Sequence, residues 1–416
     1  MKASIGLARS DSTSSPLPRT TDVLVIGGGI IGLSLAREFK HRHSDSRVTL
    51  IEKETAYGQH ASGRNSGVVH AGFYYSGDSL KARFTREGNR QLTEYCEERG
   101  LPLRRCGKLV VARDGADFAG LDELLRRARA NGIALEHVTA DDARRIEPRA
   151  RTCERALFSP TTAATDPSAV MASLACEARK SGVTLRTGTA FLRRTPSGAR
   201  TSAGAIAAGY VINAAGLHAD SIARQYGFAQ RHRIVPFKGW YLHTDSPSQG
   251  FRVHIYPVPN LDAPFLGVHI TVTANGGVKL GPTATPALWR EHYDGLRGFR
   301  LRECLEILWL EGGFFLRNDF GFRQLAAHEL RKHRRAHIVE LAAQLAEGLR
   351  AADYRRCARS GIRAQLVDLK ARKLEMDFRF EGDDRSFHVL NAVSPAFTCA
   401  LPMCAYLVDQ IEQLLG

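Results

Sequence analysis

The chain has 416 residues, 44% hydrophobic and 24% charged, which is ordinary for a folded globular protein and excludes a wholly disordered, collagen-like or coiled-coil chain. Lys and Arg outnumber Asp and Glu by 58 to 43, and the net charge of +15 suits a nucleic acid, an anionic membrane surface or a small anionic substrate. The eight cysteines form no Cys-x-x-Cys pair, which argues against a disulfide scaffold or a Cys-rich zinc site and favours reduced thiols in a cytoplasm.

The first 21 residues are rich in Ser and Thr and lack the apolar stretch of a secretory signal. We therefore expect residues 1–21 to be a disordered leader. No window in the sequence approaches the ~18 uninterrupted apolar residues of a membrane span.

A dinucleotide-binding pattern begins at Asp22. Residues 22–27 are an apolar run typical of a strand buried on both faces, and residues 48–51 predict a second strand that ends at Glu52. Between them lies a Gly-x-Gly-x-x-Gly sequence formed by Gly27, Gly29 and Gly32, followed by a predicted helix. Such glycines permit a tight turn and close approach to a pyrophosphate, while the acidic residue accepts hydrogen bonds from a ribose.

The remaining elements alternate between helices and strands. Helices are predicted over 79–99 and 117–131, from the Asp166 cap in 164–170, and through most of 287–354. Strands are predicted over 105–113 and 210–216, several antiparallel ones between 233 and 283, and a strand, turn and helix over 387–415. The pattern is that of an α/β fold, α+β overall. It predicts a discontinuous Rossmann-like domain (22–100, 160–230 and 355–416) and an inserted domain with a mixed or antiparallel sheet (101–159 and 231–354).

The choice between NAD and FAD depends on the segment after Glu52. Residues 60–75 (HASGRNSGVVHAGFYY) are rich in glycine and small side chains, which let backbone lie against a large flat ring system. Two further turns at strand ends are expected near 210–216 and 391–395, and a long, extended cofactor would contact both. FAD therefore fits better than NAD.

With these motifs the chain resembles the FAD-dependent oxidoreductases of the D-amino-acid oxidase superfamily, and within them the L-2-hydroxyglutarate dehydrogenase/oxidase group. The resemblance covers about residues 22–415. It is carried by DVLVIGGGIIGLSLA, RNSGVVHAGFYY, SLKAR, RCGKLVVA, IVPFKGWY, IYPVPN, PFLGVHIT, GPTA, GIRAQ and HVLNAVSP, in that order.

The resemblance implies where FAD is held. Gly27, Gly29, Gly32 and Glu52 would bind its adenosine diphosphate part, and Ser62, Asn65, Ser66 and Gly67 would line the pyrophosphate and flavin. Ala215 and Gly216 would border the adenine side, and the turn at Ser394 and Pro395 would approach the isoalloxazine.

It also implies oxidation of a hydroxy acid by hydride transfer to flavin N5, with electrons passed on to quinone or oxygen. A histidine suits the base that takes the hydroxyl proton, and His70 and His269 are equal candidates. Carboxylates of the substrate need fixed cations and hydroxyl donors. The candidates for that role are Lys238, Tyr256, Arg363 and Gln365.

Three departures from the family pattern bear on the substrate. Many relatives have Arg-Gly-Glu where this chain has Lys238-Gly239-Trp240, others have His in place of Arg64, and GPTA replaces GPNA. We expect an L-2-hydroxy acid, with L-2-hydroxyglutarate favoured. The alternatives are an amine or amino-acid oxidase, a glycerol-3-phosphate-type dehydrogenase, and a flavin-binding protein without activity.

The basic run 331–335 follows an apolar stretch at 301–322. The basic run can be a solvated helix face, and the apolar stretch can be an interdomain contact. Alternatively, the two together can dock a cytoplasmic protein peripherally on the inner face of a membrane. No pattern of a nucleic-acid-binding module occurs, so nucleic acid is not expected as a partner.

Overall fold

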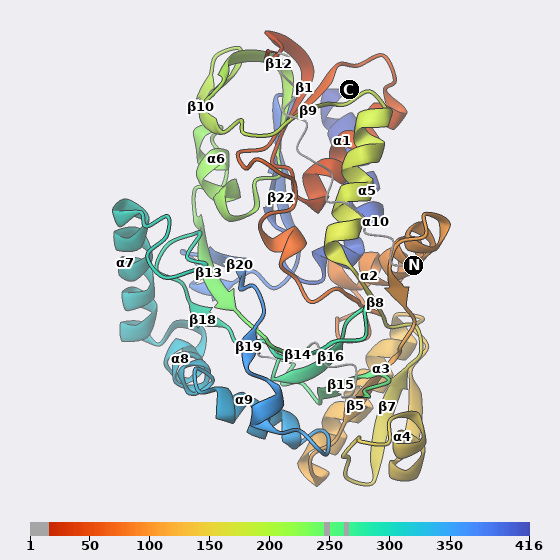
Figure 1. Cartoon of the computed structure of the whole chain (residues 1–416). Coiled ribbons are helices and arrows are strands. Elements are labelled where there is room, and N and C mark those ends of the chain that lie inside the picture. The colour runs from red at the N-terminus through yellow and green to blue at the C-terminus, as the bar shows by residue number, and fades with distance from the viewer. Residues whose placement is uncertain (1–15, 245–249, 262–265) are drawn as a thin grey trace.

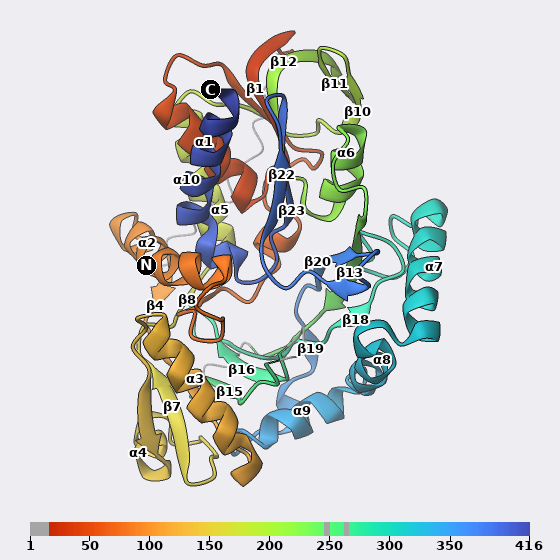
Figure 2. The ribbon, with the colours of Figure 1, turned by 180° about the vertical axis from the view of Figure 1, so that it is seen from behind.

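The computed structural model describes residues 16–244, 250–261 and 266–416, which form sheets stacked along the molecule with helices around them (Figures 1 and 2). The first sheet has the strand order β10-β11-β12-β1-β2-β9, and β23 pairs with the C-terminal half of β12 and with β22. Its strands are β1 (Thr20–Ile26), β2 (Val48–Ile51), β9 (Thr184–Arg186), β10 (Phe191–Thr195), β11 (Gly198–Thr201), β12 (Gly204–Asn213), β22 (Arg379–Gly382) and β23 (Ser386–Asn391).

Strand β1 begins two residues earlier than the sequence predicted. Thr20 and Thr21 pair with residues of β12, and the Thr21 hydroxyl donates a hydrogen bond to the Arg47 carbonyl at 2.7 Å. The prediction that residues 1–21 are disordered is therefore wrong for these two threonines, because polar β-branched residues also suit a strand. Residues 1–15 of the predicted leader lie outside the described residues.

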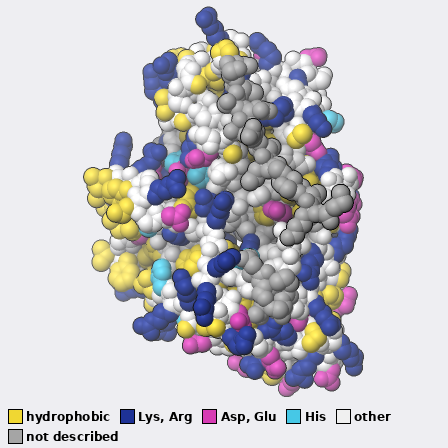
Figure 3. All heavy atoms as spheres, in the orientation of Figure 1, with side chains coloured by type: hydrophobic (Ala, Val, Ile, Leu, Met, Phe, Trp, Pro, Cys, Tyr) yellow, Lys and Arg dark blue, Asp and Glu magenta, His cyan; other side chains and the backbone are white. Residues whose placement is uncertain are grey.

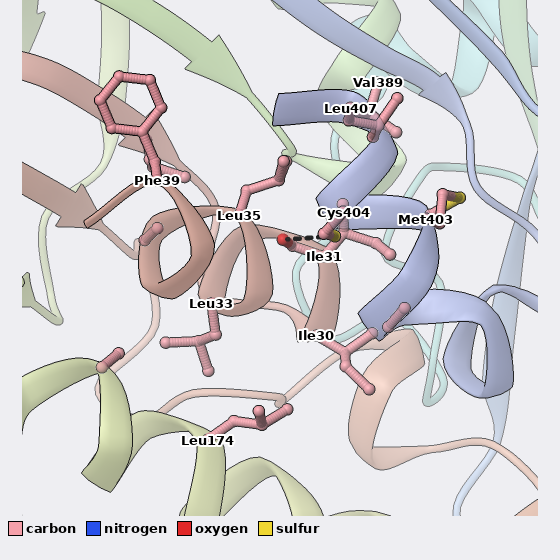
Figure 4. Packing of buried hydrophobic residues seen from close by; sticks show 14 of the residues in the cluster. Ile30, Ile31, Leu33, Leu35, Phe39, Leu174, Val389, Met403, Cys404 and Leu407 are labelled. Atoms are coloured by element: carbon pink, nitrogen blue, oxygen red, sulfur yellow. Dashed lines mark hydrogen bonds between the residues drawn. The ribbon is translucent and has the colours of Figure 1, made fainter. Parts of the chain in front are cut away.

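The helices α1 (Ile30–Arg42), α2 (Leu80–Glu98), α5 (Pro167–Lys180) and α10 (Ala396–Leu415) pack as one group beside the first sheet. Helix α10 contacts both α1 and α2, and their buried faces share one apolar core (Figure 4). Helix α5 begins as predicted, because the Asp166 carboxylate accepts a hydrogen bond from the Ser168 N–H at 2.8 Å. The short helix α6 (Ala219–Gln225) contributes Ile222 to a separate cluster with Leu24 and Ile26.

The second sheet is mixed, with the order β19-β14-β17-β16-β15-β5-β7-β6. Its strands are β5 (Lys108–Val111), β6 (Glu136–Thr139), β7 (Arg155–Ser159), β14 (Leu242–Thr244), β15 (His254–Pro257), β16 (His269–Val272), β17 (Val278–Gly281) and β19 (Arg356–Cys357). Strands β5 and β15 are parallel and the other pairs are antiparallel. One face carries apolar residues such as Leu109, Ile255 and Ile270, which pack with Ile338 of α9 (Arg335–Ala343). Helices α3 (Phe118–Ala130) and α4 (Ala140–Ile146) complete this part.

A third sheet joins segments that the predicted domain division separates. It has the order β18-β13-β20-β21, formed by β13 (His232–Gly239), β18 (Thr285–Pro286), β20 (Gly361–Asp368) and β21 (Lys373–Leu374). Helices α7 (Leu301–Arg317) and α8 (Phe322–Arg331) lie outside it, as Figure 1 shows. Because β20 pairs with β13 and β19 pairs with β14, we propose that the inserted domain also includes 356–374, which was assigned to the Rossmann-like domain.

A small three-stranded sheet, formed by β3 (Val68–Val69), β4 (Leu103–Arg104) and β8 (Ala163–Thr165), connects the parts. In the part of the chain that the structure describes, every helix is too short or too polar to span a bilayer.

The contact between α1 and α10 generates a prediction on stability. Leu407 is fully buried in the core of Figure 4, so Leu407→Ala is expected to lower the free energy of unfolding by about 2–5 kcal/mol. The matched control Leu415→Ala, at an exposed position of the same helix, is expected to change it by less than about 0.5 kcal/mol. Urea unfolding measures both values, and equal effects would show that α10 is not anchored through Leu407.

Candidate active site

A cavity of about 600 Å³ lies at the C-terminal ends of β1, β2 and β12 and extends to the polar face of the second sheet. Its lining includes most of the residues that the sequence singled out: Gly27, Gly29, Glu52, Ser62, Asn65, Ser66, His70, Ala215, Gly216, Tyr256, His269, Arg363, Ser394 and Pro395. Gly32, Gly67, Lys238 and Gln365 are not among the lining residues. One continuous wall therefore joins the glycine-rich turn to both candidate histidines.

The glycine-rich turn packs too closely for side chains. Gly27 has a φ of 112°, and a Cβ atom added there would lie 2.5 Å from the Ala214 carbonyl oxygen. A Cβ on Gly32 would lie 1.9 Å from the Gly27 carbonyl oxygen, so Gly32 supports the turn from behind rather than lining the cavity. Helix α1 starts directly after Gly29, and its first N–H groups and positive dipole end face the cavity. This cradle suits a diphosphate.

Glu52 ends β2 beside this cradle and is buried. Its carboxylate accepts hydrogen bonds from the backbone N–H groups of Gly28 at 2.6 Å and Glu54 at 2.8 Å. Each carboxylate oxygen retains acceptor capacity, which suits the hydroxyls of a ribose. The donors of the helix start and the acceptors of Glu52 together match the groups of a dinucleotide such as FAD.

The loop after Glu52 is tied to the helix start. The Ser62 hydroxyl accepts a hydrogen bond from the Ile30 N–H at 2.9 Å. The Asn65 side chain donates to the Ser62 carbonyl at 2.8 Å and accepts from the Gly67 N–H at 2.9 Å. Gly67 has a φ of 81°, and a Cβ there would lie 2.4 Å from the Thr165 carbonyl oxygen. Gly67 thus fixes the loop, while Ser62, Asn65 and Ser66 face the cavity.

His269 is held on β16 by two contacts. Its Nδ1 lies 2.8 Å from the Gly267 carbonyl oxygen, so Nδ1 carries the proton of the neutral ring and Nε2 is the acceptor nitrogen. Tyr256 stacks on the imidazole, with ring centroids 3.9 Å apart and an angle of 19° between planes. Burial is the main cause that lowers the pKa of His269 to about 3. The ring is therefore neutral and oriented, as a proton acceptor must be.

His70 lies in the loop after β3, and its backbone N–H donates to the Thr398 hydroxyl at 3.2 Å. Burial holds the pKa of His70 well below its usual value, and Lys108 and two neighbouring histidines lower it further. Both candidate histidines are thus neutral.

Of the predicted substrate-binding residues, Arg363 and Tyr256 line the cavity, whereas Lys238 and Gln365 do not. Phe237 is the residue of β13 that pairs with Arg363, and Lys238 is one position further along the strand, so its side chain points to the opposite face. The Gln365 side chain instead donates a hydrogen bond to the Glu375 carbonyl at 2.8 Å. Burial lowers the pKa of Arg363, but its guanidinium remains a fixed cation of the cavity wall, to which Lys53, Arg64 and Arg300 also contribute.

The sequence analysis missed a polar network beside Glu52. The Lys53 ammonium lies 2.8 Å from the Glu291 carboxylate and also pairs with Glu54. Glu291 accepts from His218 at 2.8 Å; although burial acts to raise the pKa of Glu291, its hydrogen bonds with His218 and Lys53 hold it below the usual value. No sequence motif signals this network, because three distant segments supply its members.

The polar face of the second sheet was also missed as a unit. Lys108 and His254 are cross-strand partners on β5 and β15, and Tyr256 and His269 face the same side one pair further along. The signal was present in the sequence as polar residues that alternate with apolar ones in each strand.

Comparison with known proteins identifies the family of this chain. The model of the FAD-dependent oxidoreductase family matches residues 22–410. The L-2-hydroxyglutarate dehydrogenase of Escherichia coli (strain K12) is 34% identical over 413 residues, covering 95% of this chain and 94% of that protein. The mitochondrial L-2-hydroxyglutarate dehydrogenase of Bos taurus is 32% identical, covering 97% of this chain and 90% of the relative.

Solved structures share the fold. The FAD-bound L-alpha-glycerophosphate oxidase of Mycoplasma pneumoniae superimposes with a TM-score of 0.75 at 20% identity, covering 96% of this chain and 95% of that one. Glycine oxidase from Geobacillus kaustophilus gives a TM-score of 0.70 at 20% identity, with 95% of each chain covered. The predicted fold class and the predicted cofactor are confirmed. The chain is an FAD-dependent oxidoreductase of the D-amino-acid oxidase superfamily and belongs to the L-2-hydroxyglutarate dehydrogenase family.

Proposed function

We propose that this enzyme oxidises an L-2-hydroxy acid, with L-2-hydroxyglutarate as substrate and 2-oxoglutarate as product. The observation that carries the proposal is the presence of a half-buried arginine, Arg363, and two neutral histidines, His70 and His269, in the wall of one cavity. An arginine recognises a carboxylate, and a neutral imidazole accepts a hydroxyl proton. The relatives named above support the choice of L-2-hydroxyglutarate.

In this proposal the protein binds, orients and deprotonates the substrate. FAD, held by the glycine-rich turn and Glu52, would supply the acceptor for the hydride, and quinone or oxygen would take up its electrons. Arg363 holds a carboxylate of the substrate, and a histidine takes the proton of the hydroxyl group. His269 is favoured over His70, because the Gly267 carbonyl and the Tyr256 ring fix its tautomer and orientation. An anionic substrate favours the imidazolium form and therefore opposes the effect of burial on the histidine pKa.

The alternative keeps the fold and changes the bond that is oxidised. The structural neighbours named above are a glycerophosphate oxidase and a glycine oxidase, so an amine, an amino acid or glycerol 3-phosphate is the competing substrate class. A protonated amine cannot donate to an arginine that already occupies the wall, whereas a second carboxylate gains from it. The cation therefore disfavours a simple amine. An amino acid and glycerol 3-phosphate also carry an anion that arginine binds, so against these two the choice of the hydroxy acid rests on the relatives named above.

The first experiment is anaerobic mixing of the FAD-loaded enzyme with L-2-hydroxyglutarate, and the expected result is bleaching of the visible flavin absorbance. The His269→Gln variant is expected to bind FAD normally but to bleach about 10²–10⁴-fold more slowly, because general base catalysis contributes that factor. His70→Gln is the matched comparison. If the rate of bleaching falls more in His70→Gln than in His269→Gln, the base is His70. Bleaching by amino acids, sarcosine or glycerol 3-phosphate alone would reject the hydroxy-acid proposal.

A second prediction concerns Arg363. Replacement by Ala removes a charge-assisted hydrogen bond of about 1.5–3 kcal/mol, so KM is expected to rise by at least about tenfold. The rate at saturating substrate is expected to fall much less, because the base remains in place. The exposed Arg359→Ala is the control for loss of positive charge in the same segment. An unchanged KM would remove Arg363 from the proposed site.

The proposal includes contact with an anionic membrane surface, where a quinone would be reached. Helices α7 and α8 expose large apolar side chains, with Trp309 77% and Leu316 76% exposed; the others are Leu301, Leu305, Leu308, Phe315 and Leu330. Figure 3 shows this apolar area at the edge of the molecule where Figure 1 draws α7. Exposed arginines accompany it at Arg302, Arg317, Arg323, Arg331, Arg334 and Arg335. Aromatic and basic groups together suit the boundary of an anionic bilayer on its inner face.

Vesicle sedimentation tests this surface. The enzyme is expected to bind vesicles with anionic lipid, to bind neutral ones weakly, and to be released by salt. The double change Trp309→Ser and Leu316→Ser is expected to abolish binding while bleaching by substrate continues at the normal rate. Leu415→Ser, at an exposed position of α10, is the control. If the double variant binds like the wild type, the α7 surface does not contact lipid and the acceptor is reached elsewhere.

A further inference from the structure

Lys108 on β5 is a buried lysine with an unusual environment. Its side chain is 0% exposed, and its ammonium lies over the rings of Phe73 at 4.9 Å, Tyr74 at 4.8 Å and Tyr256 at 4.6 Å. Among the described residues, no hydrogen-bond acceptor reaches its Nζ atom and no carboxylate pairs with it. The three rings form an aromatic box around an uncompensated charge.

Strand order connects this box to the candidate base. Strand β15 lies between β5 and β16, and the register places Lys108, Tyr256 and His269 on the same face of the sheet. Tyr256 is therefore approached by Lys108 from one neighbouring strand and by His269 from the other. Its ring stacks on the imidazole with the centroids 3.9 Å apart.

The ammonium of Lys108 does not serve to stabilise the fold. Burying an ammonium without a partner is costly, and cation–π contacts offset only part of that cost. A methionine of similar length would fill the box and contact the same rings without any charge. The environment therefore favours the neutral amine, and burial lowers the pKa of Lys108 to about 7.

We propose that Lys108 is a positioning residue of the active site, whose ammonium in the aromatic box acts through Tyr256 and His269 to set how readily the imidazole accepts the substrate proton. The proposal rests on the proposed function of His269 as the base. It adds a residue that is not among those lining the cavity.

The groups around Lys108 determine the sign of the effect. Among the described residues, the titratable or charged groups near Lys108 and His269 include the following: His70, His254, Tyr74, Tyr256, Arg363, Cys106 and Lys332. None of them is an anion at neutral pH, because burial raises the pKa of both tyrosines and of the Cys106 thiol. A charged Lys108 lowers the pKa of His70, His254 and His269 in addition to burial. A neutral Lys108 removes that repulsion, so proton acceptance by the imidazole is expected to become faster as pH rises through about 7.

Two variants fix the two charge states. Lys108→Met is neutral at every pH and Lys108→Arg is charged at every pH. In anaerobic mixing at saturating L-2-hydroxyglutarate, the wild-type rate of flavin reduction is expected to rise about tenfold through the lysine titration. Lys108→Met is expected to stay near the upper rate and Lys108→Arg near the lower one, both without that pH dependence. A wild-type titration that persists in Lys108→Met would overturn the proposal.

Thermal unfolding of the FAD-loaded enzyme provides a measurement without substrate. The folded-state pKa of Lys108 lies below its unfolded value, so the wild type loses stability as pH falls toward about 7. Lys108→Met lacks this loss, so below pH 7 its Tm is expected to equal or exceed that of the wild type, with the difference shrinking at alkaline pH. The exposed Lys373→Met is the control. If the Tm of Lys108→Met is lower than that of the wild type at every pH, Lys108 is a structural residue and the proposal is rejected. If L-2-hydroxyglutarate fails to reduce the flavin, the proposed function is wrong while this measurement still decides the charge of Lys108.

Discussion

The close packing of the start of α1 against the turn between β12 and α6 is the constraint on which the site depends. Gly27 touches the backbone after β12, and Gly32 touches Gly27, so α1 starts close against the end of β12. Any side chain at either glycine would push α1 away from β12 and remove the N–H groups from the cavity. The loop with Ser62 is in turn hydrogen-bonded to the helix start, and the path to His70 follows from it. The position of the cofactor cradle and of one candidate base thus goes back to one backbone contact.

The second sheet has one apolar face and one polar face, because side chains alternate between the two faces along each strand. Its outer face is apolar and packs with α9, while its inner face carries Lys108, His254, Tyr256 and His269. Antiparallel and mixed sheets tolerate such a division, because successive side chains point to opposite faces. The inner residues are nevertheless buried, and burial rather than ion pairing controls their protonation. The chemistry of the cavity is therefore sensitive to each charge that enters it.

Local signals predicted much of this arrangement. The glycine spacing, the acid at position 52 and the Asp166 cap depend on neighbours in sequence, and the structure has them as expected. The pairing of strands that are distant in the sequence could not be predicted from such local signals. Lys238 and Arg363 both lie in motifs shared with the family. The register of β13 against β20 nevertheless places Arg363 in the cavity wall and turns Lys238 to the opposite face. Glu291 meets Lys53 only through tertiary packing, and Lys108 differs from a surface lysine only through the rings that surround it.

The order in which strands join has a consequence for folding. Strand β1 pairs with β12, β12 pairs with β23, and α1 packs on α10, the last helix of the chain. Contacts between such distant segments carry a large loop-closure cost, which slows folding and favours populated intermediates. A chain emerging from a ribosome would leave the part of α1 that packs on α10 uncovered until residues 396–415 are made, whereas α5 covers another part of the helix earlier. The apolar core around α1 thus begins to form early in synthesis and closes only when α10 joins it.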